Sequence, residues 1–155
     1  MQNEITKVAA QVAALYKSPP LAFVHTFGCQ QNVNDSEKIR GVLALLGYGF
    51  SPSEDGADLI IFNTCAIREH AELKIFGNIG ALKARKKANP NLLIGLCGCM
   101  VQQPHIVEKV RVSYPYVDLV FGVNAIDTLP SLLSGLLAGQ KRNITPPRAC
   151  KQCYQ

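Results

Sequence analysis

Short, mostly apolar stretches alternate with helical patterns along most of this chain. This alternation is the sequence feature that most restricts which folds the chain can adopt. The predicted strands lie at residues 21–27, 58–63, 92–97 and 117–121, with a short edge strand at 48–51. Their side chains are largely apolar on both faces, which is typical of parallel strands buried between two layers of helices. The pattern therefore predicts an α/β fold built on a parallel sheet with helices on both faces.

Helical spacing of apolar residues fills the gaps between the strands. Asn34, followed by Glu37, is placed as the N-cap of the helix after the first strand, and Gly47 closes that helix. Further helices are predicted over 1–17, 75–89, 104–114 and 129–137. The short link from 48–51 to 58–63 predicts the flavodoxin-like strand order 2-1-3-4-5.

Composition limits the kind of protein that this chain can be. The chain has 155 residues, of which 48% are apolar and 17% charged, so one folded domain is expected and disorder is excluded for most of it. No stretch approaches the roughly 18 uninterrupted apolar residues of a membrane span, and the polar N-terminus does not fit a signal peptide, so a cytoplasmic protein without a membrane partner is expected. A net charge of +5 permits an acidic partner such as nucleic acid without requiring one.

The chain divides into three predicted parts. Residues 1–20 form an N-terminal helix, expected to be loosely attached, and a linker that carries Ser18-Pro19-Pro20. Residues 21–139 hold the alternating strands and helices of the domain. Residues 140–155 read as a linker stub or truncated tail.

Three cysteines come directly after predicted strands. Cys29 follows the first strand, Cys65 the third and Cys99 the fourth, so in a parallel sheet they gather along one edge. Three thiolates suit a soft metal centre, and a 4Fe-4S cluster held by three cysteines leaves one iron open. A closed zinc site would need a fourth ligand such as Cys97, and small thiols that merely pack in the core are the plain alternative.

The remaining cysteines are expected to have other roles. Cys97 should lie within its strand, in the packed core, while Gly98 releases Cys99 into the loop. Cys150 and Cys153 form a C-x-x-C pair without the strand–helix context of a redox or zinc motif. We therefore predict that none of these three binds the metal.

Polar residues near the predicted ligands could support an anionic centre. Asn32, Asn63 and Thr64 can donate hydrogen bonds to inorganic sulfide. Arg68 follows Cys65 closely and could steady an anionic cluster or substrate, although a surface ion pair explains it nearly as well.

Three segments carry a family resemblance. They are HTFGCQQNVNDSEKIRGVL, ADLIIFNTCAIREHAELKIFGNIGALK and LIGLCGCMVQQ. Across roughly residues 21–137 the chain resembles the N-terminal domain of the radical S-adenosylmethionine methylthiotransferases. The combination of GCQ-x-N with NTC-x-IRE is most similar to the branch that makes 2-methylthio-N(6)-dimethylallyladenosine in tRNA.

The resemblance implies a flavodoxin-like domain that holds an auxiliary 4Fe-4S cluster through Cys29, Cys65 and Cys99. In a complete enzyme of this family a second 4Fe-4S cluster cleaves S-adenosylmethionine, and methylthio is inserted into an N(6)-isopentenyladenosine beside the anticodon. A sulfur donor and tRNA are the implied partners, the tRNA being bound through further domains. The second cluster needs a C-x-x-x-C-x-x-C motif that this sequence does not contain, so the chain alone is expected to be inactive.

Two other functions remain open from the residues alone. A flavodoxin-like module could bind a nucleotide or flavin at the same edge of the sheet, and a zinc ion could stabilise an interaction domain. Flavin fluorescence, zinc, or iron with acid-labile sulfide in the purified protein would distinguish these possibilities.

Overall fold

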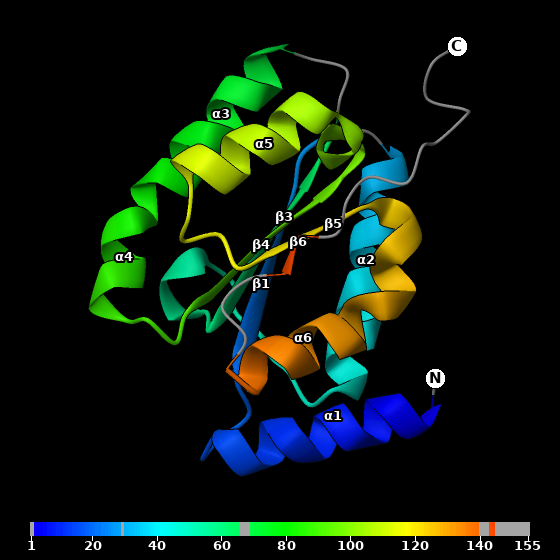
Figure 1. Cartoon of the computed structure of the whole chain (residues 1–155). Helices are drawn as coiled ribbons and strands as arrows, with labels where there is room; N and C mark the ends of the chain where they lie inside the picture. Colours follow the sequence, from blue (N-terminus) through cyan, green and yellow to red (C-terminus); the bar gives the residue numbers. More distant parts are fainter. Residues whose placement is uncertain (1, 29, 66–68, 140–142, 145–155) are drawn as a thin grey trace.

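The structure is a computed structural model that describes residues 2–28, 30–65, 69–139 and 143–144. Its centre is a parallel sheet with the strand order β2-β1-β3-β4-β5-β6 (Figure 1). The strands are β1 (Leu21–Thr26), β2 (Gly49–Phe50), β3 (Leu59–Thr64), β4 (Leu93–Gly98), β5 (Leu119–Phe121) and β6 (Asn143–Ile144). The α/β fold and the predicted order 2-1-3-4-5 are confirmed, and β6 extends the sheet beside β5.

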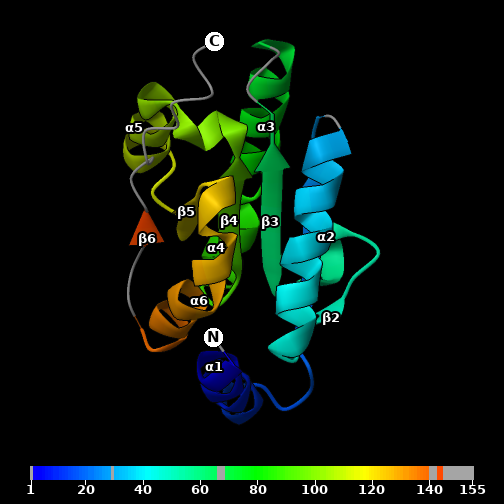
Figure 2. The same cartoon turned by 90° about the vertical axis from the view of Figure 1, so that its right-hand side faces the viewer.

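Helices cover both faces of the sheet (Figures 1 and 2). On one face lie α2 (Gln30–Leu45) and α6 (Leu129–Leu137), and on the other lie α3 (Glu69–Ala81), α4 (Lys83–Ala88) and α5 (Pro104–Ser113). The proline residues of α5 and α6 stand in the first turn, where a missing N–H costs no helical hydrogen bond. None of the described helices is long and apolar enough to span a membrane.

The predicted start of α2 is wrong. The helix begins at Gln30, directly after Cys29, so Asn34 lies inside it and is not its N-cap. The first turns of α2 bury polar side chains, Asn32 and Ser36 among them, so the apolar periodicity of the helix starts only at Ile39. That late start explains the misplaced boundary.

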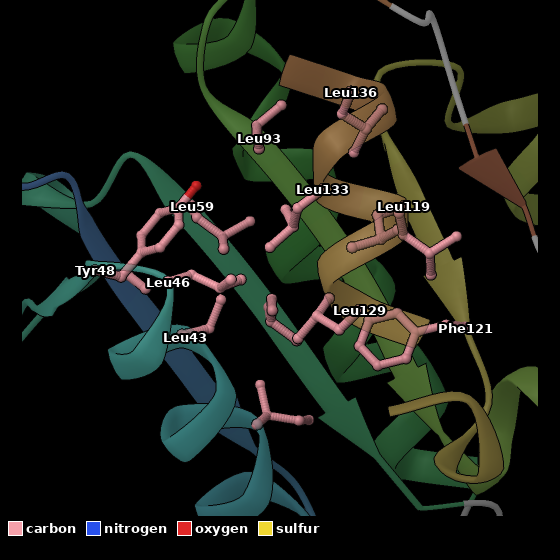
Figure 3. Close-up of a cluster of buried hydrophobic side chains, with 14 of the residues drawn as sticks. Leu43, Leu46, Tyr48, Leu59, Leu93, Leu119, Phe121, Leu129, Leu133 and Leu136 are labelled. Carbon is pink, nitrogen blue, oxygen red and sulfur yellow. The ribbon is translucent and has the colours of Figure 1, made fainter. Parts of the chain in front are cut away.

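Two apolar cores fill the space between sheet and helices. Figure 3 shows the one under α2 and α6, where Leu43, Leu59, Leu133 and their neighbours interdigitate. The helix α1 (Gln2–Leu15) adds Val8 to this core. The side chains of Gln11 and Ser134 also tie α1 to α6 by hydrogen bonds, so α1 is not loosely attached as predicted.

The end of β1 carries three aromatic side chains that are only half-buried. They are Phe23 and His25 of β1 and Phe27, which directly follows the strand, and the connection from β2 to β3 beside β1 contains only the 3-10 turn Glu54–Gly56. The His25 ring lies 4.2 Å from the Phe27 ring, and its Nδ1 lies 3.8 Å from Glu54 Oε1. Burial lowers the pKa of His25, Glu54 partly opposes this, and Lys74 adds a smaller decrease.

This depressed pKa predicts a pH-dependent stability. Because the folded state disfavours the charged His25 ring, its contribution to stability is present above the unfolded pKa of about 6.5 and is lost as pH falls below it. We expect His25→Gln to lose less stability than the wild type between pH 7.5 and 5.5, as measured by urea unfolding midpoints. Equal losses in the two proteins would contradict the assignment.

Candidate metal centre

The carboxyl ends of β3 and β4 lie level with each other. Thr64, the last residue of β3, pairs with Gly98, the last residue of β4. Cys65 and Cys99 each follow one of these two residues, and both are half-buried. Two of the three predicted ligands therefore leave adjacent strands at the same edge of the sheet.

The third predicted ligand, Cys29, lies outside the described residues, but its neighbour Gly28 is described. Gly28 has a φ of +126°, and a Cβ placed on it would lie 2.6 Å from the Cβ of Cys65 and 2.5 Å from Asn32 Oδ1. The segment that follows β1 therefore packs directly against the segment that follows β3, and a side chain at position 28 would not fit between them. Glycine, which has no Cβ and tolerates a positive φ, permits this close approach of the two segments.

Gly98 makes a similar contact on the other side of β3. Its φ is +105°, and a Cβ there would lie 2.1 Å from the carbonyl oxygen and 2.6 Å from the nitrogen of Thr64. The end of β4 therefore packs on the backbone that leads directly into Cys65. Together the two glycines bring the ends of three neighbouring strands into contact.

A buried polar network connects these strand ends. Asn63 Nδ2 donates to Asn32 O at 2.8 Å and to Ser36 Oγ at 2.9 Å. Asn32 Nδ2 donates to Thr64 O at 3.0 Å and to Asn63 Oδ1 at 3.2 Å. Thr64 Oγ1 donates to Cys97 O at 2.7 Å. These four polar side chains are all buried, so each donor has replaced water by a protein acceptor.

This network changes the expected role of the polar residues. The sequence suggested that Asn32, Asn63 and Thr64 donate to inorganic sulfide, but the structure directs their side-chain N–H and O–H groups at protein oxygens. They connect α2, β3 and β4. Ser36 was not predicted to take part, although its place four residues after Asn32 puts both on one face of a helix.

Cys97 lies in β4 and is 1% exposed, as predicted. Burial raises the pKa of its thiol well above the usual range, and the nearby Asp35 carboxylate adds to the increase. A thiol held protonated in an apolar core is a poor metal ligand, because the thiolate is the binding form. The position of Cys97 thus agrees with the prediction that it is not a ligand, which itself remains a prediction.

The described donors fit a soft metal centre. Cys65 and Cys99 offer thiols at a partly exposed edge of the sheet. In the part of the chain that the structure describes, no three metal-binding side chains are close together, and that part does not include Cys29. Arg68, Cys150 and Cys153 also lie outside the described residues.

Comparison with known proteins supports the resemblance. Residues 22–122 match the model of "Uncharacterized protein family UPF0004". The chain is 50% identical over 121 residues to a protein of Clostridioides difficile strain 630, and 51% identical over 111 residues to one of Alkaliphilus oremlandii strain OhILAs. Both are named tRNA-2-methylthio-N(6)-dimethylallyladenosine synthase.

These alignments cover 78% and 72% of this chain but only 25% and 24% of the two relatives. The chain therefore spans about a quarter of the length of the curated relatives it matches. The matched segment contains β2 to β5, all of β1 except its first residue, the three predicted ligands and the network around them. Because the family model matches most of the sheet and the whole candidate site, this chain belongs to the protein family UPF0004.

Proposed function

We propose that the chain is the iron-sulfur domain of a tRNA methylthiotransferase and that Cys29, Cys65 and Cys99 hold its auxiliary 4Fe-4S cluster. The observation that carries this proposal is that β3 and β4 end at the same level of the sheet. Cys65 and Cys99 therefore each follow one of two paired residues on neighbouring strands. The contact of Gly28 with Cys65 brings the β1 segment to the same place. The names of the relatives supply the reaction.

The bound cluster would supply an iron without a protein ligand, at which a sulfur species can be held. The residues of this chain bind and orient that centre. The thiolates of the three cysteines ligate, the glycines let the backbone approach, and the buried amides fix the loops. Arg68 would place a positive charge near an anionic centre or substrate.

The substrate proposed for the whole protein is an N(6)-isopentenyladenosine beside the anticodon of tRNA, which would receive methylthio at carbon 2. S-adenosylmethionine and a second 4Fe-4S cluster would be bound by parts of a longer protein, as would the tRNA. A separate sulfur donor would reload the site after each reaction. The name shared by the relatives supports this substrate.

A chimaera tests the proposal directly. Residues 22–122 of this chain would replace the matching segment of the Clostridioides difficile relative, expressed in cells that lack 2-methylthio-N(6)-dimethylallyladenosine in their tRNA. Mass spectrometry of the tRNA should then detect the modified nucleoside, and the Cys65→Ala version of the chimaera should give none.

The iron and sulfide content of the chimaera provides the control. A chimaera that binds both at the level of the relative yet makes no modified nucleoside would contradict the proposed reaction. Flavin or zinc in place of iron in the purified chain would instead favour the nucleotide-binding or zinc-stabilised alternatives.

A further inference from the structure

We propose that Asn63 is a positioning residue for the metal centre, and that with Asn32 it holds the three cysteine-bearing segments in their binding arrangement before a metal arrives. Asn63 stands two residues before Cys65, and Asn32 three residues after Cys29. The identity of the metal centre rests on the proposed function, whereas the positioning of the thiols does not.

The two amides are joined reciprocally. Asn63 Nδ2 reaches from β3 to Asn32 O and Ser36 Oγ in the first turns of α2, and Asn32 Nδ2 reaches back from α2 to Asn63 Oδ1 and Thr64 O. Four hydrogen bonds thus cross from the helix that follows Cys29 to the strand that precedes Cys65. A fifth contact, Thr26 Oγ1 to Ser36 Oγ at 2.7 Å, ties the end of β1 to the same helix.

The connection continues to the third segment. Thr64 Oγ1 donates to Cys97 O in β4, and the carbonyl oxygen of Thr64 is both an acceptor of Asn32 and the atom that Gly98 packs against. A displacement of the Asn63 amide would therefore move Thr64 and, through it, the backbone on either side of Cys65 and Cys99.

Only an amide meets the demands on position 63. Both of its N–H groups donate, its oxygen accepts, and its side chain is 0% exposed. An aspartate would keep the shape but could not donate to Asn32 O or Ser36 Oγ, and a buried donor or acceptor left unpaired costs far more than an exposed one. Asn32, at 2% exposed, is under a similar constraint.

The test compares Asn63→Asp and Asn63→Ala with Asn34→Ala. Asn34 is an exposed amide on α2, the helix that carries Asn32, and its Oδ1 accepts a hydrogen bond from Gln30 Nε2 at 3.4 Å. For the apo chain, Cd²⁺ affinity would be titrated through the ultraviolet absorption of cadmium thiolate. For the reconstituted chain, the rate at which a chelator removes iron would be followed.

We expect both Asn63 variants to bind Cd²⁺ about 10–100-fold more weakly and to release iron faster by a similar factor, as is typical when a partner that orients ligands is removed. Asn34→Ala should match the wild type. Asn63 variants with wild-type Cd²⁺ affinity and wild-type iron release would overturn the proposal.

The variant Ile106→Val distinguishes a loss of thiol positioning from a general loss of stability. It shortens a side chain that is 0% exposed and lies in the other core, on the side of the sheet covered by α3 and α5. This variant should be less stable yet bind Cd²⁺ normally; an equally large loss of affinity in it would assign the Asn63 effect to stability alone. If Asn63→Asp does not fold, Ser36→Ala removes one acceptor of Asn63 and should weaken Cd²⁺ binding more mildly.

The two proposals fail in different ways. If the wild type holds no iron and sulfide but the Asn63 variants still bind Cd²⁺ more weakly, the positioning role stands and the iron-sulfur function fails. If the wild type holds the cluster and the Asn63 variants hold it equally well, the function stands and the positioning role fails.

Discussion

Replacing Cys65 with alanine is expected to reduce the iron and sulfide bound after anaerobic reconstitution from about four of each per chain to below about one. Cys99→Ala and Cys29→Ala should have the same effect. A cluster with three protein ligands that loses one of them keeps only two anchoring bonds, and the half-buried edge at Cys65 and Cys99 leaves it open to solvent and chelators. Colorimetric iron and sulfide analysis measures the result.

Cys97→Ala is the matched control. It removes a thiol of the same strand end that packs in the core under α2 and α6, so iron and sulfide should stay near the wild-type content. Near-normal content in all three ligand variants would contradict the assignment. So would a loss confined to Cys150→Ala or Cys153→Ala.

The sheet could be predicted because its signal is local. The strands β3 and β4 are buried along their whole length and mostly apolar, β1 alternates buried with half-buried residues, and the predicted strand ends agree with the observed ones to within two residues. The strand order followed from one short connection, since the link between β2 and β3 has no room for a crossing helix. Cys65 and Cys99 were placed correctly for the same reason, as they come directly after strands.

The network around the cysteines could not be predicted in the same way. Asn32 and Ser36 are polar residues on the buried face of α2, so apolar periodicity excludes them from the core. Their partners Asn63 and Thr64 lie 27 to 32 positions away along the chain, and only the folded sheet brings them together. The sequence showed which residues were near the cysteines but not which atoms they would contact.

The strand β6 illustrates a second limit. Asn143–Ile144 falls in the segment predicted to be a linker stub, and two residues beside β5 give no periodic signal of their own. Its pairing depends on the backbone of β5, which offers an unpaired edge once the rest of the sheet has formed. Short edge strands of this kind are set by tertiary structure.

Gly98→Ala is expected to destabilise the fold by about 2–6 kcal/mol. The positive φ of +105° costs a residue with a side chain about 1–3 kcal/mol, and overpacking adds about 1–3 kcal/mol because the new methyl group would lie 2.1 Å from Thr64 O. The atom in the way belongs to the backbone of β3 and cannot move aside as a flexible side chain would. Urea unfolding of the apo chain measures the loss.

Gly47→Ala separates the two causes. Gly47 has a φ of +95°, but a Cβ there would meet nothing within 4 Å, so only the backbone cost of about 1–3 kcal/mol is expected. If Gly98→Ala lowers the free energy of unfolding by no more than Gly47→Ala does, the end of β4 is not packed tightly against the backbone of Thr64. If it costs several kcal/mol more, the excess measures how firmly the end of β4 rests on Thr64. That contact sets the relative height of the Cys65 and Cys99 backbones, so a surviving Gly98→Ala protein should also bind Cd²⁺ more weakly than Gly47→Ala.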